Sequence, residues 1–235
     1  MKITSTSTFR NLLFASSIAL VAFLPSCKLD EVPNPDVSAL TIINASPNST
    51  AIDFYLDNER VNAADASFVF PLRIPYQRIL AGSHQATVRA AGSATSLVQS
   101  NLSFPTNQYG SLFIIGKADA LSYLQIKDEL TYPTAGKTKV RFINLIPDAP
   151  TLTMEIVGDA TAFSNKAYKE FTNFENVTSG VKTILLKDAA TNTTVATLTD
   201  YDLKADKIYT IWAKGLITTA VTTQKAGLQV INHDL

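Results

Sequence analysis

Few residues of this chain have side chains suited to acid–base or nucleophilic catalysis. The two histidines, His84 and His233, lie far apart, and neither is next to a nucleophile motif. A Ser–His–Asp triad needs no sequence proximity, but the Gly-x-Ser-x-Gly turn that often presents the serine is absent from the sequence. Glycoside hydrolysis needs two carboxylates across a cleft, whereas Asp53, Asp57 and Glu59 surround one predicted hairpin. We predict that the protein is not an enzyme and has no catalytic residues.

The sequence also lacks clustered metal ligands, since its histidines are scattered and it has a single cysteine. The turn Asp57-Asn58-Glu59 is too short for an oxygen cage such as an EF-hand loop, although a weak calcium site there stays open. Glycine-rich phosphate loops are absent as well. We predict no metal site and no cofactor.

Cys27, the only cysteine, follows an apolar run that extends from Leu12 to Leu24. The sequence Leu24-Pro25-Ser26-Cys27 is similar to a lipobox, with Pro25 as a departure from the usual pattern. An ordinary secretory signal, the alternative, would leave a lone reactive thiol in an oxidising compartment. We therefore predict that residues 1–26 are a lipoprotein signal peptide and that Cys27 carries acyl chains, palmitate among them, that attach the protein to a membrane.

Residues 27–36 are predicted to be the acylated cysteine and a tether. The acidic pair Asp30-Glu31 close to the lipid resembles the surface-export signal of Bacteroidota lipoproteins, and an ordinary solvated tether is the alternative. Removal of residues 1–26 takes away two basic residues and no acid, so 18 basic and 20 acidic residues remain. We expect an outer-membrane lipoprotein, exposed at the cell surface, that does not bind nucleic acid.

Aromatic residues are the remaining candidates for ligand contacts. The sole tryptophan, Trp212, lies in an apolar segment and is predicted to be buried in a sandwich core rather than exposed as a sugar platform. Tyr55 alternates outward beside Asp53 and Asp57, and Tyr76 is also free to be exposed. Aromatic faces next to carboxylates suit sugar rings, so Tyr55, Tyr76, Asp53 and Asp57 form the predicted ligand-binding set.

The elements that position these residues are predicted to be strands throughout. Ile52, Phe54 and Leu56 alternate with polar residues, and so do Leu152, Met154 and Ile156; a period of two is typical of strands with one buried face. Turn clusters separate short runs rich in threonine, valine and isoleucine. Long helical periodicity is absent, and only the segment Ala160 to Phe174 leaves a short helical turn open.

The chain repeats itself with a period of about 100 residues. Four pairs of segments match: Ile42 to Asn48 with Phe142 to Asp148, Ala81-Gly82 with Ser179-Gly180, Tyr109 to Gly116 with Ile208 to Gly215, and Leu124 to Ile126 with Leu228 to Val230. We predict two β-sandwich domains of one fold, at residues 37–132 and 137–235. The short turn Tyr132-Pro133-Thr134-Ala135-Gly136 between them favours a fixed or hinged pair.

A family resemblance is carried by Asn44 to Asn48, by Ala51 to Asp57 and by Leu80 to His84. These segments resemble domain-of-unknown-function family 4397, a group of secreted and lipid-anchored bacterial proteins. The resemblance implies tandem Ig-like or transthyretin-like antiparallel β-sandwich domains over nearly all of residues 37–235, with a degraded second copy. It implies no activity and no site residues.

These observations together predict a lipid-anchored cell-envelope protein that acts as a non-catalytic binding or structural accessory module. Its ligand is expected to be a partner protein or a polysaccharide, bound by loops that the sandwich scaffold leaves free to vary. The alternatives are a hydrolase with an unrecognised site and a pure spacer. The sequence leaves the oligomeric state open.

Overall fold

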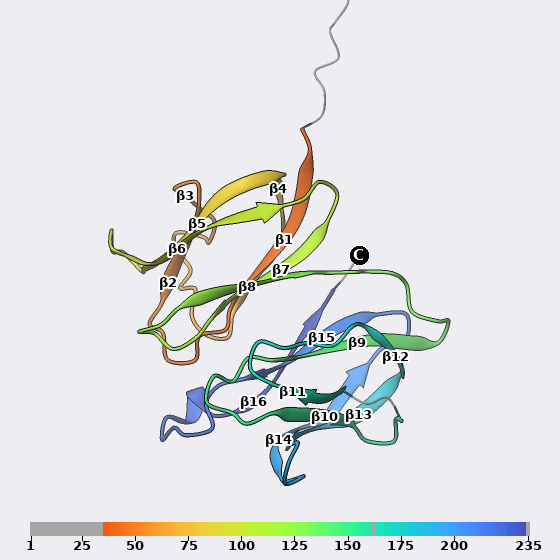
Figure 1. The fold of residues 1–235 in the computed structure, drawn as a ribbon. Coiled ribbons are helices and arrows are strands. Elements are labelled where there is room, and N and C mark those ends of the chain that lie inside the picture. The colour runs from red at the N-terminus through yellow and green to blue at the C-terminus, as the bar shows by residue number, and fades with distance from the viewer. Residues whose placement is uncertain (1–34, 161–162, 234–235) are drawn as a thin grey trace, which may run out of the picture. The chain divides into compact units, whose positions relative to one another are not determined.

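The computed structural model describes residues 35–160 and 163–233, and from Asp36 onward these residues form one compact unit. The predicted signal peptide, the predicted acylation site at Cys27 and the tether as far as residue 34 lie outside the described residues. The predicted all-β fold is confirmed, because strands form two sandwich-like units (Figure 1).

The first sandwich has one sheet with the strand order β4-β1-β7-β8 and a second with the order β3-β2-β5-β6. Its strands are β1 (Val37–Asn44), β2 (Ile52–Leu56), β3 (Glu59–Arg60), β4 (Arg73–Leu80), β5 (Gly82–Ala90), β6 (Ser96–Phe104), β7 (Tyr109–Ile115) and β8 (Ser122–Lys127). Neighbouring strands are antiparallel except β1 and β7, which are parallel. The β4-β1-β7-β8 sheet is therefore mixed, whereas the β3-β2-β5-β6 sheet is purely antiparallel, as predicted.

The second sandwich repeats this arrangement, with sheets β12-β9-β15-β16 and β11-β10-β13-β14. Its strands are β9 (Lys137–Asn144), β10 (Leu152–Ile156), β11 (Phe163–Lys166), β12 (Glu175–Thr178), β13 (Gly180–Asp188), β14 (Thr194–Leu203), β15 (Ile208–Lys214) and β16 (Gly227–Asn232). The pair β9 and β15 is parallel, as β1 and β7 are. The strand β11 lies within the segment Ala160 to Phe174, for which the sequence allows a short helical turn.

The matching strand orders confirm the sequence repeat. Gly116 and Gly215, which end the two matched segments, show why one residue recurs: their φ angles are +94° and +95°. A Cβ at either position would lie 2.3 Å from a backbone oxygen, of Ala120 or Lys225 respectively. Only glycine fits this turn without strain.

Each sandwich encloses its own apolar core. The first core contains Ile52, Phe54 and Phe104, and the second contains Phe142, Met154 and other buried residues. The predicted alternation is realised in β10, where Leu152, Met154 and Ile156 are all fully buried and the residues between them are not.

A third apolar cluster lies between the two sandwiches. It joins Ile43 and Phe113 of the first sandwich to Ile143 and Trp212 of the second. Trp212 is fully buried, as predicted, but it packs across this junction, edge-on to Phe70 and Phe113, rather than inside one sandwich. Because β1, β7 and β15 bury one face in a sandwich and the other in the junction, each contains an unbroken run of buried residues.

Helical structure is nearly absent from the part of the chain that the structure describes. Its one helical element is a 3₁₀ turn, η1, at Thr222–Gln224. A helix long and apolar enough to cross a membrane does not occur within these residues.

Candidate functional site

The repeated Asn-x-x-Pro motif serves the fold in both copies. Asn44 Oδ1 accepts from the N–H of Ser46 at 3.2 Å, and Asn44 Nδ2 donates to the carbonyl of Phe68 at 3.2 Å. Asn144 makes the same two bonds, to the N–H of Ile146 at 3.1 Å and the carbonyl of Lys166 at 2.9 Å. Each asparagine is fully buried. The motif therefore closes a turn and ties it to the segment that crosses between sheets.

The residue that follows the proline of each motif bonds a loop that is distant in sequence. Asn48 Oδ1 accepts from the N–H of Ala118 at 2.9 Å. Asp148 accepts from the N–H groups of Ile217 and Thr218 at 2.9 Å and 3.0 Å. These bonds show that the residue after the motif holds the loops that follow β7 and β15.

The four residues of the predicted ligand-binding set do not converge. Tyr55 lies on β2, in one sheet, and Tyr76 on β4, in the other. The Arg89 guanidinium lies over the Tyr55 ring, 4.5 Å from its centroid. Asp53, which is predicted to face outward, is instead buried. Its carboxylate is satisfied there by an ion pair with Arg60 and by the N–H of Gly92.

Asp57 belongs to a tight hairpin turn and binds His84. Asp57 and Asn58 have φ angles of 48° and 67°, as a two-residue type I′ turn requires. Asp57 accepts from the N–H of Gln85 at 2.8 Å and lies 2.5 Å from His84 Nδ1. These hydrogen bonds, that from Gln85 first, lower the pKa of Asp57 below its ordinary value. His84 Nε2 lies 2.9 Å from the carbonyl of Leu80, so both ring nitrogens face acceptors.

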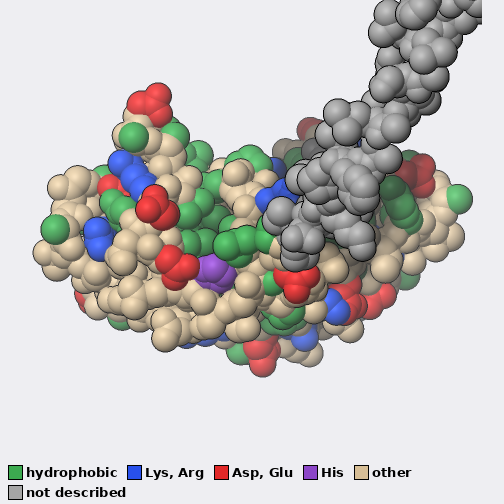
Figure 2. Space-filling view, turned by 90° about the horizontal axis from the view of Figure 1, so that it is seen from above, with side chains coloured by type: hydrophobic (Ala, Val, Ile, Leu, Met, Phe, Trp, Pro, Cys, Tyr) green, Lys and Arg blue, Asp and Glu red, His purple; other side chains and the backbone are tan. Residues whose placement is uncertain are grey.

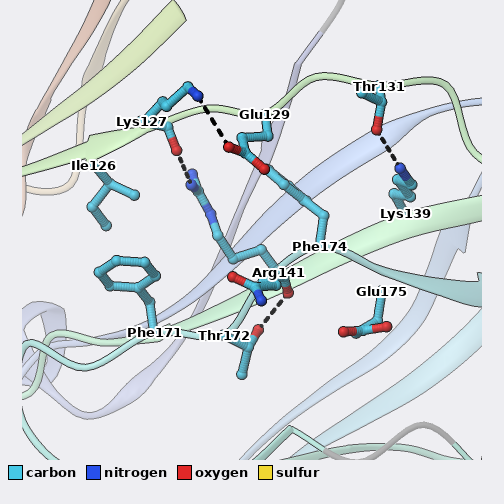
Figure 3. A pocket seen from close by; sticks show the side chains of 11 residues that line it. Ile126, Lys127, Glu129, Thr131, Lys139, Arg141, Phe171, Thr172, Phe174 and Glu175 are labelled. Carbon is cyan, nitrogen blue, oxygen red and sulfur yellow. Dashed lines mark hydrogen bonds and ion pairs between the residues drawn. The ribbon is translucent and has the colours of Figure 1, made fainter.

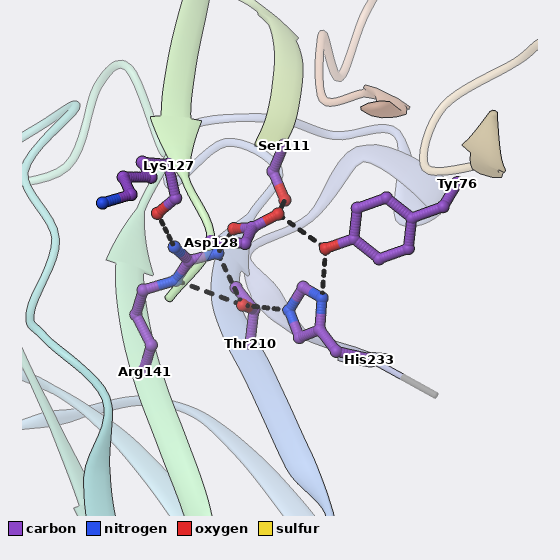
Figure 4. Close-up of polar contacts among 7 residues, drawn as sticks. All are labelled: Tyr76, Ser111, Lys127, Asp128, Arg141, Thr210 and His233. Atoms are coloured by element: carbon purple, nitrogen blue, oxygen red, sulfur yellow. Dashed lines mark hydrogen bonds and ion pairs between the residues drawn. The ribbon is translucent and has the colours of Figure 1, made fainter. Parts of the chain in front are cut away.

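A buried polar ring connects the two sandwiches (Figure 4). At its centre Arg141 of β9 pairs with Asp128, which follows β8, at 2.7 Å; the side chains are 2% and 0% exposed. Asp128 Oδ2 also accepts from Ser111 Oγ at 2.7 Å and from Tyr76 Oη at 2.6 Å. Arg141 further donates to the carbonyl of Lys127 at 3.3 Å. A charge pair buried this deeply is stable only with such additional bonds.

Thr210 and His233 complete the ring. Thr210 Oγ1 accepts from Nε and Nη2 of Arg141 at 3.2 Å and 2.8 Å, so its single proton is left for His233 Nε2 at 2.7 Å. His233 Nε2 is thereby assigned as an acceptor, and Nδ1 is assigned as the donor to Tyr76 Oη at 2.8 Å. Tyr76 then donates to Asp128. Two routes of donated hydrogen bonds thus lead from Arg141 to Asp128, one direct and one through Thr210, His233 and Tyr76.

The polar ring holds the sandwiches together and is unsuited to nucleophilic catalysis. Thr210 is fully buried, and its oxygen already accepts two bonds from Arg141. Burial, followed by the negative charge of Asp128, raises the pKa of Tyr76 far above its ordinary value, so the phenol stays protonated as the ring requires.

A groove opens at the edge of this junction (Figure 3) and has a volume of about 460 Å³. The first sandwich and the residues after it contribute one wall, and the second sandwich contributes the other. The lining residues are Ile126, Lys127, Glu129, Thr131, Lys139, Arg141, Phe171, Thr172, Asn173, Phe174 and Glu175. Neither sandwich alone forms this groove.

The groove combines aromatic surface with charges of both signs. Phe171 is 42% exposed, and Phe174 stacks on Arg141 with the guanidinium 4.5 Å from the ring centroid. Lys127 pairs with Glu129 at 3.1 Å, and Lys139 Nζ donates to Thr131 Oγ1 at 2.5 Å. Mixed charge also marks the face shown in Figure 2, where acidic and basic side chains are interspersed.

The sequence contains signals for the polar ring that an analysis of periodicity alone misses. Arg141 is the one charged residue in the run Val140 to Ile143, and the other three residues are apolar. Thr210 is similarly placed among the apolar residues of β15. A charged side chain in a strand that is buried on both faces requires a partner of opposite charge. The position of Arg141 therefore indicates a buried carboxylate elsewhere in the chain.

The fold and these sites define a tandem β-sandwich protein in which the described residues hold no group of three or more His, Cys, Asp or Glu that could bind a metal ion. The chain belongs to the family described as "Domain of unknown function (DUF4397)", whose model matches residues 38–155. The match covers the first sandwich and ends in β10, so the second copy is recognised by its strand order. No curated protein matches the sequence.

Two solved structures show distant similarity. One is a family 26 carbohydrate-binding module from Eubacterium rectale in complex with maltoheptaose, at 9% identity and a TM-score of 0.28, with 85% of this chain and 98% of that chain covered. The other concerns alpha-glucan binding by a streptococcal virulence factor, at 12% identity and a TM-score of 0.26, covering 76% and 92%. Similarity at this level does not establish a shared ligand.

Removal of one member of the buried pair should destabilise the whole unit. We expect Asp128→Asn to lower the free energy of unfolding by about 3–5 kcal/mol, because Arg141 keeps a buried charge without a counterion. Urea denaturation measures this. Glu129→Gln, which breaks the exposed pair with Lys127 on the neighbouring surface, should cost less than about 1 kcal/mol. Equal effects of the two variants would contradict the role assigned to the ring.

The hairpin carboxylate should make stability depend on acid pH. Because the pKa of Asp57 is lowered in the folded protein, its contribution is present above the ordinary carboxyl pKa and is lost as pH falls through the lowered value. Melting temperature measured against pH should fall less steeply on acidification for Asp57→Asn than for the wild type. Asp65→Asn, at an exposed position, serves as the control. Superimposable profiles of wild type and Asp57→Asn would refute this assignment.

Proposed function

We propose that the protein is a non-catalytic, glycan-binding module of the cell envelope, attached to the outer membrane by acyl chains on Cys27 and exposed at the cell surface. The observation that carries the binding role is the groove between the sandwiches. Its volume lies in the range typical of small-molecule sites, and it joins aromatic surface to a few polar groups.

The chemistry of the groove favours a neutral oligosaccharide. Exposed Phe171 offers an apolar face for the C–H side of a sugar ring, and Asn173, Glu175 and Lys139 supply donors and acceptors for hydroxyl groups. Positive charge is offset locally, since Lys127 is paired with Glu129 and Arg141 with Asp128. The carboxylates of Glu129 and Glu175, which line the groove, would repel a polyanion. This argues against nucleic acid and strongly acidic polymers as ligands.

The binding role is tested by affinity electrophoresis in gels that contain starch, glucomannan or xylan, with polygalacturonate as an anionic comparison. We expect retardation by at least one neutral polysaccharide and about tenfold weaker binding by Phe171→Ala, because an aromatic contact is lost. Tyr132→Ala removes an aromatic residue that is 78% exposed and lies outside the groove, and it should bind as the wild type does.

Thermal melting of each variant checks that the fold is retained. Absence of retardation in every gel, or equal retardation of Phe171→Ala and wild type, would end the glycan proposal. Binding to a protein but to none of the polysaccharides would instead favour a protein partner.

The anchor rests on the sequence before the described residues, where an apolar run ends in a lipobox-like segment and Cys27. In a Bacteroidota host, the wild type should sediment with the outer membrane and be removed from intact cells by added protease. Cys27→Ala should leave the membrane fraction, because a lipidated cysteine supplies the hydrophobic attachment. Membrane association of Cys27→Ala equal to wild type would refute acylation, and protection from protease would place the protein in the periplasm.

A further inference from the structure

Two long edge strands occupy equivalent positions in the two sandwiches: β6 next to β5, and β14 next to β13 (Figure 1). An edge strand presents unpaired backbone groups to any other strand, and proteins usually protect such edges with charge, proline or bulges. Because β6 and β14 occupy the same position in equivalent sheets, differences between them reflect their sequences rather than the fold.

The second sandwich protects its edge. β14 carries Asp200 and Asp202, and Asp200 adopts a φ of 54°. Its pairing with β13 shifts register between Lys182 and Ile184, so the strand is irregular where it is charged. These are the devices expected of an edge that must stay unpaired.

The first sandwich lacks these devices on β6. The strand is nine residues long, Ser-Leu-Val-Gln-Ser-Asn-Leu-Ser-Phe, without charge or proline. Its pairing with β5 is regular from Gly82 opposite Phe104 to Val88 opposite Val98, and the register shifts only near Ser96.

The backbone directions of β6 follow from its neighbour. Gln85 points its N–H and carbonyl toward β2, because they bond Asp57 Oδ1 and the N–H of Asp57. In an antiparallel sheet the residue opposite Gln85, which is Asn101, then turns its own N–H and carbonyl outward, and so does Gln99 two residues away. Ser103 follows the same parity, and its outward carbonyl accepts from Gln125 Nε2 at 2.8 Å.

The centre of β6 is chemically palindromic about Ser100. Val98 matches Leu102, Gln99 matches Asn101, and Ser100 matches itself. When two copies align antiparallel with Ser100 on the twofold axis, Gln99 of one copy lies opposite Asn101 of the other. These are the residues whose backbone groups point outward, so the register supplies two hydrogen-bonded residue pairs.

We propose that β6 is a self-association edge, at which two copies of this chain pair antiparallel about Ser100 and join their β3-β2-β5-β6 sheets into one. The absence of charge on β6 means that the twofold brings no like charges together, whereas two β14 strands would oppose aspartates. Val98 and Leu102, which pack against the first core, would meet across the axis and continue that core.

Sedimentation velocity tests the proposal on the chain with Cys27→Ser, which removes the predicted lipid site. We expect a monomer–dimer equilibrium in this background. Gln99→Lys with Asn101→Lys places lysines opposite each other and should raise the dimer dissociation constant about tenfold or more. Gln99→Lys with Asn101→Asp places opposite charges across the axis and should retain the dimer. Circular dichroism of each variant confirms the fold.

A second measurement fixes the register. Ser100→Cys, the only cysteine in the Cys27→Ser background, should form a disulfide-linked dimer under mild oxidation, because directly opposed residues on the axis lie within disulfide range. Thr199→Cys on β14 is the matched control and should remain monomeric. A monomer at all concentrations, dissociation by both double variants, or equal crosslinking of the two cysteine variants would overturn the proposal.

Discussion

The buried ion pair between Arg141 and Asp128 is the constraint on which the rest of the structure depends. Desolvating two charges is costly, and the cost is met only if every remaining donor and acceptor finds a partner. Here Ser111, Tyr76, Thr210 and His233 supply those partners, from strands of both sandwiches and from residues close to the chain's end. A shift between the sandwiches would break several of these bonds at once, so the polar ring determines their relative register.

The groove is a consequence of that register. Its walls come from the two sandwiches, and Phe174 contributes to it while stacked on Arg141. The side chain that neutralises Asp128 thus also supports the groove's aromatic surface. A groove assembled in this way is supported by the buried contacts below it rather than by a disulfide.

Strand periodicity, turn residues and the repeat were sufficient to predict the fold, because they are local properties. The Asp57-Asn58 turn and the buried strand β10 follow directly from such signals. The site could not be predicted in the same way. Asp53 was expected to face outward because the alternation in β2 is regular, yet Arg60 and Asn62 cover it. Tyr76 was expected to be exposed because nothing near it in sequence shows that His233 of the second sandwich and Asp128 bind its hydroxyl group and that the side chain is partly buried. Alternation identifies the two faces of a strand but not whether another domain covers the outer face.

The junction also shows that the repeated unit and the unit with a fully covered surface are different parts of the chain. Sequence repetition and strand order divide the chain into two equivalent sandwiches, each with its own core. Yet the outer face of the β4-β1-β7-β8 sheet carries Phe113, Ile43 and Ile126, which are buried in a cluster that the second sandwich completes. A chain that ended after the first repeat would expose this apolar surface together with the unpaired carboxylate of Asp128. The repeated unit is therefore smaller than the unit that covers all of its apolar surface.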